Sequence, residues 1–271
     1  MTNLAFAEPT SDALPLHLVT KETLKTWQES LPNETNAWLT ACGFSAAAGS
    51  VQLLPSADGG IAGADAGLGD ENDRRRTRFI GAKVRLALPE GTFEIVTDLP
   101  VPILEENALC WLLAGNSFGR YREARGPKAA LVAPDGVDRA RLERIVAAEA
   151  RVRDLINIPA NDMGPAELAA GARDLADQYG ATFNVIKGDA LLEHGFPLIH
   201  TVGRAAMRTP RLIDFNWGEK GPKISLVGKG VCFDTGGLNL KPGCSMSLMK
   251  KDMGGAANVL GLAQMIMDSG A

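Results

Sequence analysis

The stretch LVGKGVCFDTGGLNLK, residues 226–241, joins an apolar start to a glycine-rich run that carries two lysines and an aspartate. A second carboxylate, Asp252, follows within MKKDMGGAA, residues 249–257. Lysines and carboxylates in such a cluster have no use in a hydrophobic core. They suit a hydrolase with two metal ions, because carboxylates bridge hard cations, one amine can be a ligand and another can polarise a carbonyl.

The local pattern predicts where these side chains lie. Residues 223–228 are predicted to form a strand, and Lys229 and Asp234 follow its carboxyl end, where binding groups gather in open α/β sheets. Asp252 precedes the last predicted helix, residues 254–268, where its charge opposes the positive helix dipole. We therefore expect the two lysines and two carboxylates on a glycine-rich frame that follows an apolar strand.

Both motifs resemble the signature region of the leucyl aminopeptidase (cytosol aminopeptidase) family of dinuclear metallopeptidases. The segment DLINIPAN, residues 154–161, is similar to the helix-end motif of that family. The resemblance extends from about Arg139 to the C-terminus, whereas residues 1 to about 130 match only in layout. The signature is long and keeps unusual polar residues in a fixed order, so it is specific.

The resemblance implies a role for each polar side chain. Lys229, Asp234 and Asp252 would be metal ligands, with Asp234 bridging two divalent ions, and Lys229 would have to be neutral. Lys241 would stay charged and polarise the substrate carbonyl. Met249 would line the pocket for the first substrate side chain, with simple core packing as the alternative. Manganese or zinc is the expected metal, and magnesium is a further candidate.

By resemblance, the intact enzyme would remove N-terminal residues, preferentially apolar ones, from peptides and would assemble as a homohexamer. The family also has a second motif, Asn-Thr-Asp-Ala-Glu-Gly-Arg, which this sequence lacks. We therefore expect a fragment, or a domain completed by a separate chain, and we expect the 271-residue chain alone to be inactive. The alternative is a catalytically inactive family member with a binding or regulatory role.

Two other classes of function fit less well. A phosphate-binding P-loop needs Ser or Thr after its lysine, but Gly230 follows Lys229, and no Gly-x-Gly-x-x-Gly fits because position 233 is Phe. The net charge of −4 and the pI of about 5.5 argue against a nucleic-acid surface. The basic run at residues 74–78 is expected to be a solvated loop beside acidic residues.

The ligand types and the expected compartment follow from the few histidines and cysteines. The chain has three histidines and no His-Glu-x-x-His pair, so Asp, Glu and Lys must hold any metal.

Its four cysteines form no Cys-x-x-Cys pair, which fits reduced thiols in a cytosolic protein. The N-terminus has no basic residue before its short apolar stretch, and no apolar run approaches the ~20 residues of a membrane span. We expect a cytoplasmic protein with no membrane segment.

Alternating predicted elements indicate an α/β fold. A smaller N-terminal α/β domain is expected at residues 1–135, a linker helix at 136–160, and the first part of a mixed-sheet α/β/α catalytic domain at 161–271. The predicted strands are 14–19, 51–54, 91–96, 128–133, 182–186, 211–217 and 223–228. The predicted helices are 21–31, 34–42, 77–88, 105–118, 138–157, 164–180, 189–193 and 254–268. Residues 56–73 are expected to be a mobile loop with a short strand around Ile61.

Overall fold

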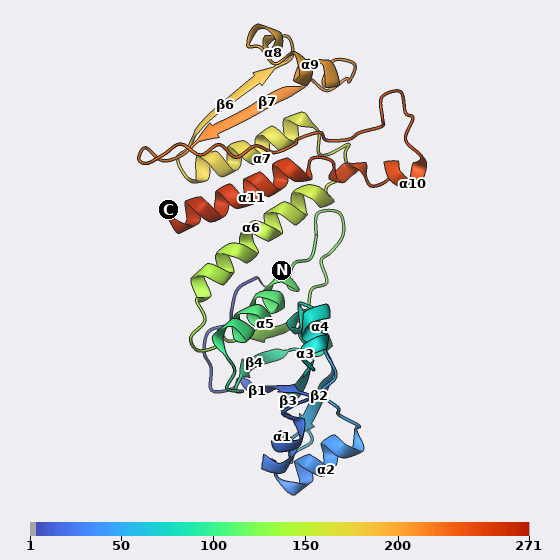
Figure 1. Cartoon of the computed structure of the whole chain (residues 1–271), viewed down its shortest axis with the longest axis vertical. Helices are drawn as coiled ribbons and strands as arrows, with labels where there is room; N and C mark the ends of the chain where they lie inside the picture. Colours follow the sequence, from blue (N-terminus) through green and yellow to red (C-terminus); the bar gives the residue numbers. More distant parts are fainter. Residues whose placement is uncertain (1–3, 271) are drawn as a thin grey trace. The chain divides into compact units, whose positions relative to one another are not determined.

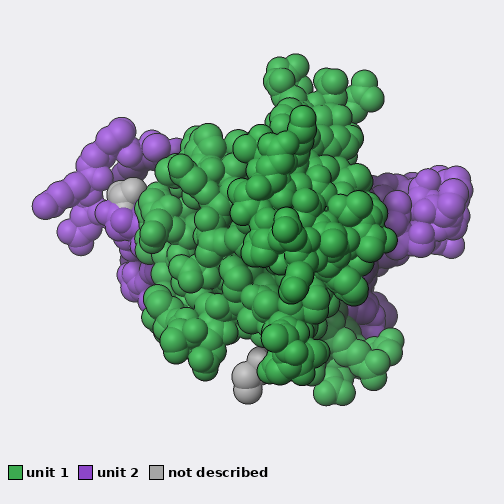
Figure 2. All heavy atoms as spheres, turned by 90° about the horizontal axis from the view of Figure 1, so that it is seen from below, with its two compact units in different colours: residues 1–146 green, residues 147–271 purple. Residues whose placement is uncertain are grey.

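The computed structural model describes residues 4–270. The chain divides into two compact units, residues 1–146 and 147–271 (Figure 2). The division falls inside the long helix α6, Arg139–Asn157. Both units combine helices and strands, which confirms the predicted α/β class. The narrower domain limits given above stay a prediction.

Unit 1 is built on a mixed five-stranded sheet in the order β2-β3-β1-β4-β5 (Figure 1). Only β2 runs antiparallel to its neighbour. The strands are β1 Leu14–Thr20, β2 Val51–Pro55, β3 Ile61–Gly69, β4 Gly91–Ile95 and β5 Ala129–Leu131. The helices are α1 Leu24–Ser30, α2 Asn33–Ala41, α3 Glu71–Arg76, α4 Ile80–Ala87 and α5 Val101–Leu113.

Alternation along the central strand β1 separates two hydrophobic cores. Leu16 and Leu18 point into the larger core, together with buried residues of α4 and α5. Val19 points to the other face, where it packs with Leu39 of α2. The sheet therefore buries both faces, which accounts for the strongly apolar character of its central strands.

The prediction of a mobile loop at residues 56–73 is wrong. Residues 61–69 form β3, a nine-residue strand that is buried along most of its length. Its glycines indicated a loop, but they are needed for close packing: a Cβ at Gly67 would lie 2.2 Å from the carbonyl oxygen of Ala47, and one at Gly63 would lie 2.8 Å from that of Pro15. Small residues let β3 fit between β2 and β1.

Two further predictions in unit 1 need correction. The helix expected at residues 77–88 begins only at Ile80, because Phe79 adopts the left-handed conformation with φ of 64°. The basic run expected to be a loop lies largely in α3, where Asp70 and Asp73 form a capping box at the helix start. The basic residues 74–76 end that helix, where they oppose the negative end of its dipole.

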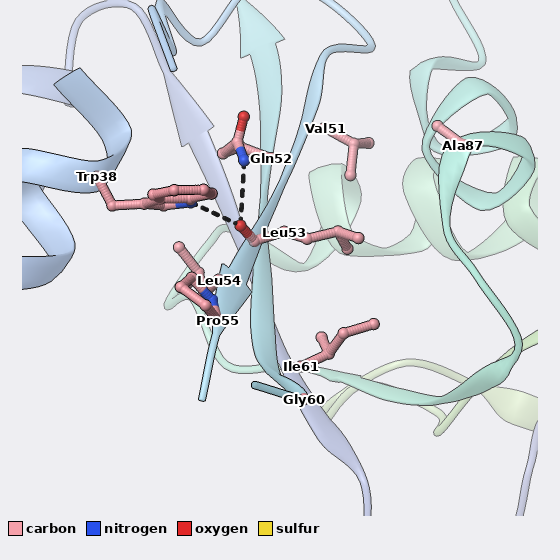
Figure 3. Close-up of a pocket in the computed structure, with 9 residues that line it drawn as sticks. All are labelled: Trp38, Val51, Gln52, Leu53, Leu54, Pro55, Gly60, Ile61 and Ala87. Carbon is pink, nitrogen blue, oxygen red and sulfur yellow. Dashed lines mark hydrogen bonds between the residues drawn. The ribbon is translucent and has the colours of Figure 1, made fainter. Parts of the chain in front are cut away.

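The outer edge of the sheet has a shallow apolar hollow (Figure 3). The Nε1 of Trp38 and the Nε2 of Gln52 both donate to the carbonyl oxygen of Leu53, at 3.0 and 3.1 Å. These side chains occupy a backbone acceptor of the edge strand β2 and so oppose pairing with another chain. All the predicted site residues lie in unit 2, so this hollow belongs to no part of the predicted site.

Unit 2 contains the end of α6 and an antiparallel strand pair, β6 Thr182–Lys187 with β7 Arg211–Asn216. Helices α7 and α11 pack against each other beside this pair (Figure 1). The helices after α6 are α7 Pro165–Gln178, α8 Ala190–Glu193, α9 Pro197–Gly203, α10 Gly243–Met246, the 3-10 turn η1 Met249–Lys251, and α11 Gly254–Ser269. Within residues 4–270, no helix is long and apolar enough to cross a membrane.

The strand predicted at residues 223–228 is absent. This segment is irregular, and its apolar side chains are exposed, to 80% at Ile224 and 90% at Val227. A strand forms only when a neighbour satisfies its backbone groups, and no other part of residues 4–270 pairs with this one. The prediction is wrong for the described residues: the apolar pattern is typical of a buried strand, but residues 4–270 supply no segment that pairs with it.

A buried carboxylate, Asp65, lies at the centre of unit 1. The indole Nε1 of Trp27 donates to its Oδ2 at 3.1 Å, and its Oδ1 is buried with no hydrogen-bond partner among the described residues. Burial raises the pKa of Asp65 from 3.8 to about 6. Its register partner His17 contacts Trp27 in a tilted arrangement, with ring centroids 4.3 Å apart. Burial lowers the pKa of His17, which favours its neutral form.

We predict that Asp65→Asn stabilises unit 1 more at pH 7 than at pH 4. The folded-state pKa lies above the unfolded value, so the contribution of Asp65 to stability is fully present below pH 3.8 and is lost as the pH rises through about 6. The loss is up to ~3 kcal/mol. Urea unfolding from pH 4 to 7 should show the difference in unfolding free energy between variant and wild type growing with pH.

The exposed Asp58 offers a control with the opposite sign. Hydrogen bonds from the Ser56 hydroxyl and the Gly60 N–H lower the pKa of Asp58, so its contribution to stability is lost as the pH falls. Asp58→Asn should therefore lose stability relative to wild type at neutral pH. If the difference in unfolding free energy between Asp65→Asn and wild type did not change with pH, Asp65 would not be a buried carboxylate with a raised pKa.

Candidate metal centre

The five predicted site residues all lie in the last quarter of the chain, in unit 2. Lys229 and Asp234 follow the irregular segment 223–228, and Lys241 ends the turn that begins at Thr235, where its N–H donates to the Thr235 carbonyl at 3.0 Å. Met249 opens η1, and Asp252 caps the end of that turn, immediately before α11.

Two stretches of backbone, Gly228–Lys229 and Gly255–Ala256, lie very close to each other where α11 begins. The N–H of Ala256 donates to the carbonyl oxygen of Lys229 at 2.8 Å. A Cβ at Gly255 would lie 2.8 Å from the Lys229 nitrogen, and one at Gly228 would lie 2.5 Å from the Gly255 oxygen. Only glycine fits at both positions. The start of α11 therefore packs directly against the Gly228–Lys229 backbone.

Four of the predicted side chains form two pairs of opposite charge. The Nζ of Lys229 lies 2.8 Å from Oδ1 of Asp252, and the Nζ of Lys241 lies 2.8 Å from Oδ2 of Asp234. The Lys241 Nζ also lies 3.2 Å from the sulfur of Met249. The five predicted residues therefore form two groups in contact: Lys229 with Asp252, and Lys241 with Asp234 and Met249.

The two ion pairs favour the charged forms of Lys229 and Asp234. The hydrogen bond to Asp252 raises the pKa of Lys229, and the hydrogen bond from Lys241 lowers the pKa of Asp234. The N–H of Gly236 also donates to Asp234 at 2.8 Å, which the positive φ of Gly236 allows. A ligating lysine must be neutral, so a metal on Lys229 would have to replace its ion pair with Asp252.

The donor set fits a hard cation but is small. The Asp252 carboxylate is 13% exposed, and its Oδ2 is buried with no hydrogen-bond partner among the described residues. Such an orphaned oxygen is costly unless a cation or a water reaches it. However, residues 4–270 contain no group of three His, Cys, Asp or Glu side chains that could hold an ion. Two carboxylates are too few to balance two divalent cations.

Profiles of one protein family match both units. The profile described as the cytosol aminopeptidase family, catalytic domain, matches residues 150–271, and the M17 aminopeptidase N-terminal domain matches residues 14–134. The chain belongs to the cytosol aminopeptidase family. The catalytic-domain match contains every predicted site residue, and the N-terminal match extends the resemblance to the part of the sequence where only the layout agreed.

Individual family members agree with this placement. Peptidase B of Pectobacterium carotovorum subsp. carotovorum (strain PC1) is 39% identical over 163 residues, which cover 56% of this chain and 37% of that protein. The crystal structure of a cytosol aminopeptidase from Coxiella burnetii superposes with a TM-score of 0.90 at 36% identity and covers 98% of this chain and 58% of that one. The bottromycin maturation enzyme BotP, solved in complex with Mn, has a TM-score of 0.73 at 29% identity, over 96% of this chain and 57% of that one.

The chain spans less than two thirds of the length of these relatives. The Coxiella comparison covers nearly all of this chain but 58% of the other, so family members carry a large further region that has no counterpart here.

One contact near the candidate centre was not predicted from sequence. The Nζ of Lys250, beside Met249, donates to the carbonyl oxygen of Asn157 at the end of α6. The two consecutive lysines before Asp252 were the available signal, but their spacing does not tell which one turns inward.

We predict that Gly255→Ala disrupts the centre while Gly254→Ala does not. The new methyl at position 255 would press on the Lys229 backbone, whereas at 254 it would meet only Ile156, at 3.6 Å. Overpacking of this kind costs ~1–3 kcal/mol. Thermal unfolding should show a lower midpoint for Gly255→Ala alone, and equal midpoints would mean that the close approach is not rigid.

Proposed function

We propose that the full-length protein is a metal-dependent aminopeptidase that removes N-terminal residues, preferentially apolar ones, from peptides. Family membership supports this activity. The observation that carries it is the meeting of Lys229 with Asp252 and of Lys241 with Asp234, beside a buried carboxylate oxygen that lacks a partner. A P-loop is disfavoured because Lys229 is engaged by a carboxylate rather than facing an open helix end.

In this proposal Lys229, Asp234 and Asp252 hold the cations. When bound, two divalent ions would supply an activated water for attack on the scissile carbonyl. Manganese or zinc is the proposed metal, with magnesium as a further candidate; a relative, BotP, was solved with Mn. The donors here are oxygen and amine groups, which suit these borderline and hard ions.

The proposed role of Lys241 is to donate a hydrogen bond to the substrate carbonyl as negative charge develops on its oxygen. In the described structure its ammonium is paired with Asp234. If Asp234 were to hold a cation, the Lys241 ammonium would lose this ion pair and could turn to the substrate carbonyl. Met249, in contact with the Lys241 amine, is proposed to line the pocket for the first substrate side chain.

We further propose that this chain is one part of the catalytic domain, and that the missing carboxylates come from additional sequence or from a second chain. The share of each relative that remains uncovered supports this, as do the exposed apolar side chains of residues 224 and 227. By family resemblance we propose a cytoplasmic homohexamer. A catalytically inactive member remains the second candidate, because the described residues hold only two site carboxylates.

We predict that Asp234→Asn and Asp252→Asn each abolish metal-dependent turnover in the full-length gene product. A neutral amide binds a hard dication weakly and cannot balance its charge. Leucine p-nitroanilide hydrolysis is measured after chelation and titration with manganese and zinc. Asp177→Asn, on the exposed face of α7, is the matched control and should keep wild-type activity. Turnover near wild type in either site variant would remove the metal assignment.

A second variant separates catalysis from metal binding. Lys241→Ala should lower kcat on the order of 100-fold, as expected for loss of an oxyanion donor, while the bound metal content stays unchanged. Metal content is measured by elemental analysis beside the same peptidase assay. Loss of the metal together with activity would instead make Lys241 a ligand or a structural residue.

A further inference from the structure

The turn that carries Asp252 is tied to the end of helix α6. The Lys250 Nζ donates to the carbonyl oxygen of Asn157 at 3.1 Å, and this bond is partly buried. It joins residues 93 positions apart. The neighbouring lysine of the same turn, Lys251, is exposed. Of two adjacent lysines, the structure therefore turns one inward to a specific backbone acceptor.

The acceptor, the carbonyl oxygen of Asn157, lies at the C-terminal end of α6, where a positive charge is favourable. The last carbonyls of a helix have no partner within the helix and carry the negative end of its dipole. Asn157 is the final residue of α6, and the last turn of α6 has no basic residue of its own. Lys250 supplies that missing positive charge from a distant part of the chain, which makes its hydrogen bond a charge-assisted one.

Lys250 lies two residues before Asp252, and the backbone between them has little freedom. The N–H of Asp252 donates to the Met249 carbonyl at 3.0 Å, and that of Lys251 to the Leu248 carbonyl at 3.1 Å. Met253, on the other side of Asp252, is fully buried. Asp252 is thus held between an anchored lysine and a buried methionine, with its carboxylate directed to Lys229.

We propose that Lys250 is a positioning residue that fixes the Asp252 carboxylate for cation binding by anchoring η1 to the C-terminus of α6. This inference rests on the proposed metal function. Residues that orient a ligand without touching the metal set affinity by holding the ligand in its binding geometry, and their loss typically costs ~10–100-fold in affinity.

The test uses the full-length gene product and two readouts. Mn²⁺ affinity is measured by competition with a fluorescent chelator for Lys250→Met, Lys250→Arg and the matched control Lys251→Met. We expect Lys250→Met to bind at least ~10-fold more weakly. Lys251→Met should bind as wild type, and Lys250→Arg should recover most of the affinity, because its guanidinium can also donate to a carbonyl. Equal affinities for the two Met variants would overturn the proposal.

The second readout needs no metal. Amide hydrogen exchange in the metal-free protein should speed up across residues 249–253 in Lys250→Met and stay unchanged in α7, because the anchor acts locally. Faster exchange in both regions, or a lower affinity without faster exchange at 249–253, would overturn the positioning role. Should Lys250→Met fail to fold, Lys250→Leu, which also lacks a donor, replaces it under the same criteria. Wild-type protein that binds no Mn²⁺ would count against the proposed function, and the exchange rates would still decide whether Lys250 anchors the turn.

Discussion

The close contact between two stretches of backbone, Gly228–Lys229 and Gly255–Ala256, is the constraint on which the candidate centre depends. One hydrogen bond of 2.8 Å joins them, and no side chain fits at either glycine. Because η1 and Asp252 lead directly into α11, this contact delivers Asp252 to Lys229. Without it, Lys229 and Asp252 would lie on separate segments with no ion pair between them.

Helix packing holds one half of the centre in place. Gly261 of α11 lies against Val152 and Ala148 of α6, where a Cβ would come within 2.5 Å of the valine side chain. The same helix buries Leu260 and Met267. Asp252 therefore sits at the start of a rigid element, and Lys250 ties the preceding turn to the same helix α6. A carboxylate on such a fixed backbone is well placed to be a ligand in the proposed metal site.

The other half of the centre is held by local contacts. Asp234 and Lys241 belong to a turn closed by one backbone hydrogen bond and one ion pair, within a segment whose apolar side chains are largely exposed. Such a segment has few buried contacts to fix it. Residues 223–228 likewise form no strand, because no segment of residues 4–270 pairs with them.

Sequence periodicity found most elements, and its errors have physical causes. The helix predicted at 138–157 agrees with α6 because a one-sided apolar stripe is a property of the segment alone. Only the start of β3, the short strand expected around Ile61, was predicted. The rest was taken for a loop because its glycines indicate a loop in isolation, whereas the contacts of Gly63 and Gly67 with neighbouring backbone require them. The strand at 223–228 was wrongly predicted because pairing depends on a second segment, which periodicity cannot see.

The sequence alone determined which chemical groups belong to the candidate centre, because their types and order lie within residues 226–257. Tertiary structure decided how they pair: Lys229 meets Asp252, 23 positions away, while Asp234, only five positions away, pairs with Lys241. It also left one Asp252 oxygen without a partner and turned Lys250, not Lys251, toward α6. Local order limits which side chains can be neighbours, but contacts between distant segments depend on how the helices pack.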